Sequence, residues 1–318
     1  MPELTVPDTQ ILLSKRANVF YLEHARVMVK DGRIIYLTEF KRGVDRGFNL
    51  PDRNTSFVLL GKGTSITDGA VRMLAESGVL VGFCGSGGTP LVSGIDIAFL
   101  TPQSEYRPTE YMQDWMRMWL DEERRLSAAK LFMSDRLELT NSNWCASASL
   151  RRRNASIHDG TARKLRAASA AATSTGQLLA AEGEFAKALY ATLASAFRLD
   201  EFKRDEGRRS KNGVSATINS FLDHGNYLAY GYAAVALYAL GISFALPLLH
   251  GKTRRGALVF DVADLVKDAV VMPVAFELGS QRAKDQEFRN ELIDAMQSMG
   301  AVDVMIETIK KTIERTRA

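Results

Sequence analysis

The segment TPQSEYRPT, residues 101–109, divides the sequence into two parts of different character. From Thr109 to Leu246 the chain has no proline, and this tract is rich in Ala, Leu, Arg and Glu, which favour helices. Before Pro102, short apolar runs alternate with glycine-containing turns. We therefore expect an α+β fold of two domains, with a β-rich domain over residues 1–101, a linker over 102–109 and a larger all-α domain over 110–318.

The β-rich part contains a hairpin signal and two further strand candidates. Residues 25–38, ARVMVKDGRIIYLT, alternate in polarity on both sides of a central Asp-Gly pair, which favours a type I′ turn. The runs 55–61 (TSFVLLG) and 78–85 (GVLVGFCG) predict short strands. Between them, residues 64–78 predict a helix with Thr or Ser at its N-cap and a glycine at its C-terminal end.

The composition is that of a soluble globular protein. Of its 318 residues, 46% are hydrophobic and 25% charged, and 41 Lys and Arg against 37 Asp and Glu give a net charge of +4. Such a small excess permits an anionic partner without requiring one. Local basic clusters fit either solvated faces or contacts with nucleic acid, and they lie at residues 124–125, 151–153, 203–204 and 208–211.

The cysteines and the N-terminus indicate a cytoplasmic protein. Cys84 and Cys145 lie far apart and no CxxC occurs, so neither a disulfide framework nor a structural zinc site is expected. The first ten residues, MPELTVPDTQ, lack the basic and apolar regions of a signal peptide.

One uncharged stretch, residues 225–251, fits either a membrane span or a buried core helix. It contains Asn226, several tyrosines and Pro247, and its most apolar part is broken at Gly241. A span needs about 20 predominantly apolar residues. A buried helix of a soluble protein is therefore the better prediction.

Glu182 is a carboxylate in the middle of an apolar helical stripe within residues 177–197, QLLAAEGEFAKALYATLASAF. At about 100° per residue, five apolar side chains fall within about 60° of it, namely Leu178, Phe185, Ala186, Leu189 and Leu193. A buried unpaired charge costs several kcal/mol or more, so this carboxylate must be neutralised. An ion pair with an arginine, a kinked N-terminal turn and coordination of a metal would each meet that need.

A second polar cluster lies in residues 248–268, LLHGKTRRGALVFDVADLVKD. Asp261 and Asp264 are three residues apart, which places both on one face of a helix. The same spacing fits an N-cap and its N3 partner in a capping box. His250 follows an apolar run, a common place for a structural histidine.

Considered with Glu182, this cluster also fits a metal site. One histidine and carboxylates from two separate segments form a mixed nitrogen and oxygen set, which suits Mn²⁺ or Mg²⁺ better than structural zinc. The adjacent basic turn would then hold a phosphodiester through Lys252, Arg254 and Arg255.

Six segments spread over nearly the whole chain carry a family resemblance: SKRANVFYLEHARV (14–27), LLGKGTSIT (59–67), GVLVGFCGSGGTPL (78–91), TPQSEYRPTEY (101–111), FLDHGNYLAYG (221–231) and residues 248–268. They resemble the universal integrase subunit of CRISPR spacer acquisition, the first CRISPR-associated protein, and most closely its subtype I-F. In the wider family an E-G pair opens a helix, a histidine ends an apolar run and a D-x-x-D follows. The matching positions here are Glu182-Gly183, His250, and Asp261 with Asp264.

The resemblance implies a set of site residues. Glu182, His250 and Asp264 would coordinate Mn²⁺ or Mg²⁺, and Asp261 would support that site. Tyr230 would lie beside it and, with the basic turn, contact DNA phosphates. Phe260 stands where some members of the family carry a tyrosine, so any role of a hydroxyl group at that position is absent here.

The resemblance also implies an architecture and partners. An N-terminal β-sandwich-like domain would join two copies into a homodimer, and the helical domain would hold the metal site. The expected partners are double-stranded and branched DNA and the second CRISPR-associated protein, which in this subtype is fused to a helicase-nuclease.

The implied activity is that of a metal-dependent DNA endonuclease and integrase. It would join captured DNA fragments into the CRISPR array by attack of a 3′-hydroxyl on a repeat-end phosphodiester, and would also cleave DNA. Two alternatives belong to other classes: a non-catalytic DNA-binding scaffold, and a membrane-associated protein that uses residues 227–246.

Overall fold

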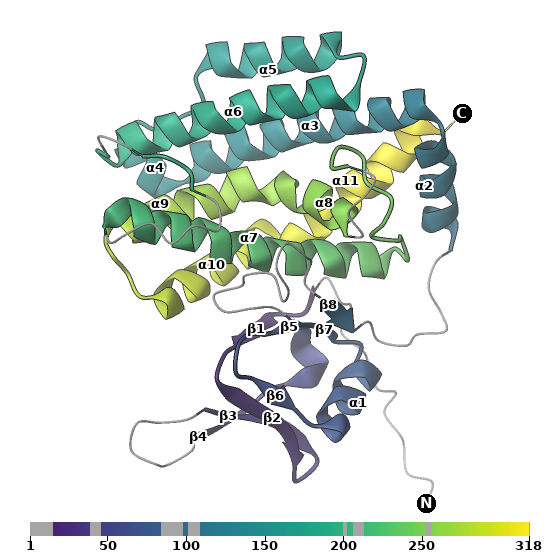
Figure 1. Ribbon diagram of the computed structural model, residues 1–318, viewed down its shortest axis with the longest axis vertical. Helices are drawn as coiled ribbons and strands as arrows, with labels where there is room; N and C mark the ends of the chain where they lie inside the picture. The colour runs from purple at the N-terminus through teal and green to yellow at the C-terminus, as the bar shows by residue number, and fades with distance from the viewer. Residues whose placement is uncertain are drawn as a thin grey trace, which may run out of the picture. The chain divides into compact units, whose positions relative to one another are not determined.

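The computed structural model describes residues 15–38, 46–83, 98–100, 109–199, 202–205, 213–251 and 256–317, with only the backbone for 98–100. The described residues fall into two compact units, one ending at residue 100 and the other beginning at residue 109. The first unit consists mainly of strands and the second of helices (Figure 1). The predicted α+β class is thus confirmed.

The first unit contains two four-stranded sheets. One has the order β1 (Asn18–Leu22), β5 (Thr55–Leu60), β7 (Leu80–Phe83), β8 (Ala98–Leu100); β8 is antiparallel to β7 and the other pairs are parallel. The other has the order β4 (Arg46–Asn49), β3 (Arg33–Thr38), β2 (Ala25–Lys30), β6 (Ser65–Ile66), and only the β2–β6 pair is parallel. Both sheets and helix α1 (Asp68–Glu76) share one core, which includes Leu22, Val27, Ile34, Val58, Leu74 and Val81.

Local signals explain the turns of this unit. The predicted hairpin is β2 and β3, joined through Asp31 (φ 50°) and Gly32 (φ 70°), and a type I′ turn needs positive φ at both positions. Helix α1 begins after Thr67, whose side chain accepts a hydrogen bond from the N–H of Ala70 at 3.4 Å. It is followed by Gly78 at φ 71°, as a helix C-terminus favours.

The second unit is a bundle of helices (Figure 1). Their bounds are α2 (Glu110–Leu120), α3 (Glu122–Ala146), α4 (Ala148–Arg152), α5 (Asp159–Ala171), α6 (Thr175–Ala196), α7 (Val214–Ala239), α8 (Ala257–Val266), α9 (Met272–Ser280), α10 (Asp285–Met299) and α11 (Ala301–Thr316). Helix α7 packs against α8, α9, α10 and α11 and is buried on most of its circumference. The uncharged stretch is therefore a core helix as predicted, and in the described part of the chain no helix has the length and apolarity to cross a membrane.

A π turn, Lys267–Val271, joins α8 to α9. Pro273 explains it, because proline has no N–H to donate and its ring collides with the carbonyl four residues earlier in an α-helix. The N–H of Met272 donates to the carbonyl of Lys267, five residues back, so the carbonyl of Asp268 loses its usual donor. The indole Nε1 of Trp144 in α3 donates to that carbonyl at 2.9 Å.

Two helical glycines are expected to respond oppositely to alanine. A Cβ at Gly225 in α7 would lie 2.5 Å from Val271 Cγ1 and 3.2 Å from Phe288 Cζ, whereas one at Gly183 in α6 would meet no atom within 4 Å. Gly183→Ala should raise the free energy of unfolding by about 0.5–1 kcal/mol. Gly225→Ala should lower it by about 1–3 kcal/mol through overpacking. Urea denaturation measures both, and stabilisation by Gly225→Ala would be inconsistent with the close packing of α7 on the π turn.

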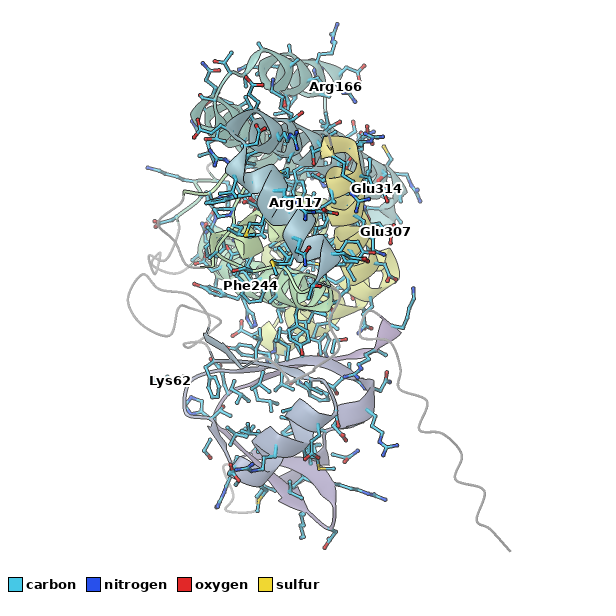
Figure 2. All side chains as sticks on the ribbon, turned by 90° about the vertical axis from the view of Figure 1, so that its right-hand side faces the viewer. Lys62, Arg117, Arg166, Phe244, Glu307 and Glu314 are labelled. Carbon is cyan, nitrogen blue, oxygen red and sulfur yellow. The ribbon has the colours of Figure 1, made fainter. Side chains whose placement is uncertain are left out.

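Most charged side chains of the helical unit lie on its outside. Arg117 on α2 and Glu307 and Glu314 on α11 point outward (Figure 2). The buried charged residues among those described in this unit are Asp135, Arg136, Asp261, Asp264 and Asp268. Four of these five lie around one point, where the predicted metal ligands also meet.

Candidate metal centre

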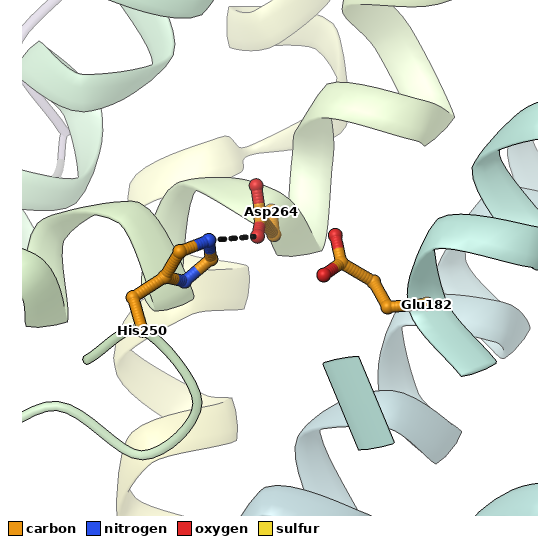
Figure 3. A group of neighbouring side chains, drawn as sticks. All are labelled: Glu182, His250 and Asp264. Atoms are coloured by element: carbon orange, nitrogen blue, oxygen red, sulfur yellow. Dashed lines mark ion pairs between the residues drawn. The ribbon is translucent and has the colours of Figure 1, made fainter. Parts of the chain in front are cut away.

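The three predicted metal ligands come together from separate segments of the chain (Figure 3). Glu182 is on α6, His250 follows α7 and Asp264 is on α8, and one possible ligand atom from each lies within 4.8 Å of the others. The two carboxylates and the imidazole point toward one another. A single cation at this point could therefore contact all three side chains.

Glu182 is held in place by a buried arginine. Its side chain is 17% exposed, and its Oε1 accepts a hydrogen bond from Nη1 of Arg136 in α3 at 2.8 Å. Among the described residues its Oε2 accepts no hydrogen bond. On the sequence alone, an ion pair and metal coordination are alternatives for Glu182. In the structure they are compatible, because Oε1 pairs with the arginine and Oε2 is left for a metal.

His250 is oriented by Asp261. The ring Nδ1 lies 2.7 Å from Asp261 Oδ1, and the same carboxylate accepts hydrogen bonds from the backbone N–H groups of Leu248 (2.6 Å), Leu249 (3.2 Å) and His250 (3.1 Å). A carboxylate only accepts, so Nδ1 carries the proton, and in the neutral imidazole the lone pair is therefore on Nε2. Nε2 lies 4.0 Å from Asp264 Oδ2, on the side of the other two ligands. Metal-binding histidines are commonly held in this way.

The capping-box hypothesis for Asp261 and Asp264 is wrong. Helix α8 begins at Ala257, directly after Gly256, so Asp261 is the fifth residue of the helix and its side chain is fully buried. The apolar residues before it, from Ala257 to Val259, are buried too, and their burial extends the helix upstream of the aspartates. Both carboxylates therefore face the protein interior rather than the first turn.

Neither oxygen of Asp264 has a hydrogen-bond partner of good geometry among the described residues, but one of them is in close ion-pair contact with a lysine. Lys267 Nζ lies 2.5 Å from Oδ1. Oδ2 accepts no hydrogen bond in the described part of the chain, and its nearest polar neighbours are Arg136 Nη1 at 3.7 Å and His250 Nε2 at 4.0 Å. A buried carboxylate oxygen left in this state is a ligand atom suited to a cation.

Arg136 and Asp268 form a buried ion pair beside the ligands. Arg136 Nε donates to Asp268 Oδ2 at 2.6 Å, and the two side chains are 5% and 1% exposed. Sequence reasoning missed Arg136, which lies on the buried face of α3 with Phe132, Thr140 and Trp144. At helical spacing the positions nearest this arginine include Asn143 and Thr140, so hydrophobic periodicity does not mark it as it marks Glu182.

The charges of the cluster leave room for a divalent cation. Its carboxylates are Glu182, Asp261, Asp264 and Asp268, and its permanent cations are Arg136 and Lys267. With a neutral imidazole and ionised carboxylates, two negative charges are unbalanced. Carboxylate oxygens with one imidazole nitrogen are also donors that Mn²⁺ accepts readily and Mg²⁺ tolerates. The residues present therefore fit such an ion.

The neighbours of the carboxylates alter their protonation. Burial alone would raise the pKa of Asp264, but the charges of Lys267 and Arg136 outweigh it and hold this pKa below its ordinary value. Burial raises the pKa of Asp268, with Arg136 opposing. Burial would lower the pKa of Arg136 itself, yet the surrounding carboxylates raise it well above its ordinary value. Both Asp264 and Arg136 are accordingly charged at neutral pH.

Of the other predicted site residues, the structure places Tyr230 near the centre, but it does not describe the basic turn. Tyr230 on α7 lies near the centre, because Lys267 Nζ is 5.5 Å from its ring centroid. Phe260 packs between Tyr230 and His250, with ring centroids 4.7 Å and 6.0 Å away. The basic turn predicted to hold phosphate lies outside the described residues and comprises Lys252, Arg254 and Arg255.

The sequence matches the family "CRISPR associated protein Cas1" over residues 21–309, which include every residue of this centre. The chain belongs to the Cas1 family. The resemblance stated from its motifs is thereby confirmed.

Individual relatives support the same assignment. The CRISPR-associated endonuclease Cas1 of Pseudomonas aeruginosa is 47% identical over 315 residues, 96% of this chain and 95% of the relative. That of Pectobacterium atrosepticum is 44% identical and covers 94% and 93%. The structure of a Cas1 protein from Thermotoga maritima has a TM-score of 0.73 at 15% identity, with 94% and 96% covered, and so shares the fold.

Proposed function

We propose that this chain is a divalent-metal-dependent DNA endonuclease and integrase of CRISPR adaptation. It joins captured DNA fragments into the CRISPR array by attack of a 3′-hydroxyl on a repeat-end phosphodiester, and it also cleaves DNA. The observation that carries the proposal is the convergence of Glu182, His250 and Asp264 from three distant segments. Family membership and relatives named as endonucleases support it.

Each residue of the centre has a distinct role in this proposal. Mn²⁺ or Mg²⁺ would be held by three atoms: Glu182 Oε2, His250 Nε2 and Asp264 Oδ2. When bound, the ion supplies positive charge that polarises the scissile phosphate and stabilises the attacking or leaving oxygen. Asp261 fixes the imidazole tautomer through its contact with Nδ1. Lys267 occupies the remaining oxygen of Asp264.

The joining reaction exchanges one phosphodiester for another. The 3′-oxygen of the captured fragment bonds to phosphorus, the bond from that phosphorus to the oxygen of the adjoining strand breaks, and the hydroxyl proton ends on the released oxygen. No nucleotide cofactor is required, because one ester forms as one is lost. With water as the nucleophile, the same exchange cleaves the strand.

The remaining parts of the proposal concern binding. The DNA backbone phosphates next to the centre are contacted by Lys252, Arg254, Arg255 and Tyr230. The positive charges of the first three and the hydroxyl group of the tyrosine suit phosphate oxygens. Double-stranded and branched DNA are the substrates. The β-rich unit joins two copies into a homodimer, and the second CRISPR-associated protein, fused to a helicase-nuclease, completes the complex.

The test is strand joining by the purified chain, alone and with its CRISPR-associated partner. A labelled fragment with a 3′-hydroxyl is incubated with repeat DNA in Mn²⁺, in Mg²⁺ and in EDTA, beside an identical fragment ending in a dideoxynucleotide. Joined product is expected only with the metal and the 3′-hydroxyl together. DNA binding of equal strength in metal and in EDTA, with no joined or cleaved product in any arm, would instead identify a non-catalytic scaffold.

A further inference from the structure

A recess at one end of the helical unit carries basic residues that the metal centre does not use. Its volume is about 1120 Å³, and it lies between the C-terminal ends of α4, α6 and α9. These helix ends are on the left of Figure 1. The described residues that line it include no carboxylate. Its polar side chains are hydroxyl groups, a histidine, an asparagine and three arginines, Arg152, Arg153 and Arg198.

Two of these arginines have no partner within the described chain. Arg153 is already engaged, because its Nη1 donates to Ser149 Oγ at 3.1 Å and its guanidinium lies 4.5 Å from the ring centroid of Phe197. Arg152 and Arg198 are exposed, and no carboxylate of the described residues lies within ion-pair distance of either. Among the described residues, the recess therefore offers two unpaired guanidinium groups, and a third guanidinium group, that of Arg153, contacts both Ser149 and Phe197.

The backbone at Arg198 has a conformation that is unfavourable for a side chain. Arg198 directly follows the C-cap of α6 and has φ 56°, in the left-handed region where glycine is preferred. A side chain in that region costs about 1 kcal/mol or more. A cation near a helix C-terminus returns only about 0.3–1 kcal/mol at an exposed site. Stability alone thus does not favour arginine here, whereas binding of an anion does.

The recess is separate from the metal centre. Helix α6 ends at Ala196, fourteen residues beyond Glu182 and about 21 Å along the helix axis at 1.5 Å per residue, and Arg198 lies just past that end. The lining residues Thr192 and Ser195 face about 80° and 140° away from Glu182 around the same helix. A ligand in the recess therefore lies beyond the reach of the three metal ligands.

We propose that this recess binds backbone phosphates of a DNA segment away from the site of strand transfer. The inference rests on the proposed DNA function. Guanidinium groups and hydroxyls are the protein groups that most often contact phosphate oxygens. A volume of this size exceeds that of one phosphate group, so a stretch of DNA backbone fits it better than a small anion does.

The test is the salt dependence of DNA binding. Anisotropy of a labelled 30-base-pair duplex is measured at several salt concentrations with Arg152→Gln combined with Arg198→Gly. Loss of two phosphate contacts should reduce the slope of log K against log salt by about two. Arg198→Gly removes the strained side chain, so the melting temperature should not fall. Arg282→Gly is the matched control, since Arg282 follows α9 with φ 53° but does not line the recess.

The outcomes separate this inference from the proposed function. A smaller slope in the double variant but not in Arg282→Gly supports it, whether or not the wild type joins strands. A slope equal to that of the wild type overturns it, even if metal-dependent joining is observed. Inorganic phosphate forms a second arm: if it raises the melting temperature of the wild type only, while the DNA slopes stay equal, the recess binds a free anion and the DNA proposal is wrong.

Discussion

Replacing Glu182, His250 or Asp264 is expected to lower metal-dependent DNA cleavage and joining by at least about 100-fold. Loss of residues that merely support metal ligands typically costs 10–100-fold, and loss of a ligand should cost more. Glu182→Ala, His250→Ala and Asp264→Asn are suitable, the last because asparagine keeps the volume next to Lys267 and Arg136. Initial rates on a labelled branched substrate give the result, with circular dichroism as the check on folding.

The same experiment contains its own graded controls. Glu184→Ala removes a carboxylate two residues along α6 that is exposed and paired only with lysines, so its rate should match the wild type. The rate of Asp261→Asn should lie between those of the wild type and the ligand variants. Its metal affinity should fall about 10–100-fold, because the substitution disturbs the orientation of His250 without removing a ligand. Wild-type rates in two of the three ligand variants would rule out the metal assignment.

Arg136→Met is expected to lower the free energy of unfolding by about 3–5 kcal/mol. The substitution leaves the Asp268 carboxylate without its ion-pair partner. Because that side chain is only 1% exposed, an unpaired charge there destabilises the folded state strongly. It also releases Glu182 Oε1 from its hydrogen bond. Urea denaturation monitored by tryptophan fluorescence gives the value, and the loss is expected without any metal or DNA present.

Two further variants show whether the ion pair is responsible. Arg117→Met removes an arginine that is 68% exposed in its pair with Asp114, and should cost less than about 1 kcal/mol. Combining Arg136→Met with Asp268→Leu removes both charges and should recover much of the lost stability. A cost below about 1 kcal/mol for Arg136→Met alone would show that the buried pair does not hold α3 to the π turn.

Local patterns in the sequence predicted much of the fold and the ligands. The hairpin at residues 25–38 and the helix ending before Gly78 follow from turn and cap preferences, which act over a few residues. Glu182 was found because a carboxylate in an apolar stripe is conspicuous at helical periodicity. That it would meet His250 and Asp264 was first a hypothesis from their donor types and was then specified by the family resemblance, since nothing local brings three distant segments together.

The parts that sequence reasoning missed depend on long-range packing. The parallel pairing of β5 with β7 joins segments on either side of α1, and alternation within a strand does not determine its neighbour. Asp261 was assigned as a possible cap because the D-x-x-D spacing fits one, but burial of the residues before it extends the helix. Pro273 is visible in the sequence, but the π turn beside it is not. In that turn the backbone carbonyl of Asp268 accepts its hydrogen bond from the indole of Trp144, which depends on the packing of α3.

The most direct test of the metal centre is anomalous diffraction from a crystal of the wild-type chain grown with Mn²⁺. We expect one strong manganese peak about 2.0–2.3 Å from an oxygen of Glu182, Nε2 of His250 and an oxygen of Asp264. A crystal with well-defined density for these side chains and manganese bound only elsewhere, or not at all, would show that the three residues do not form a metal site.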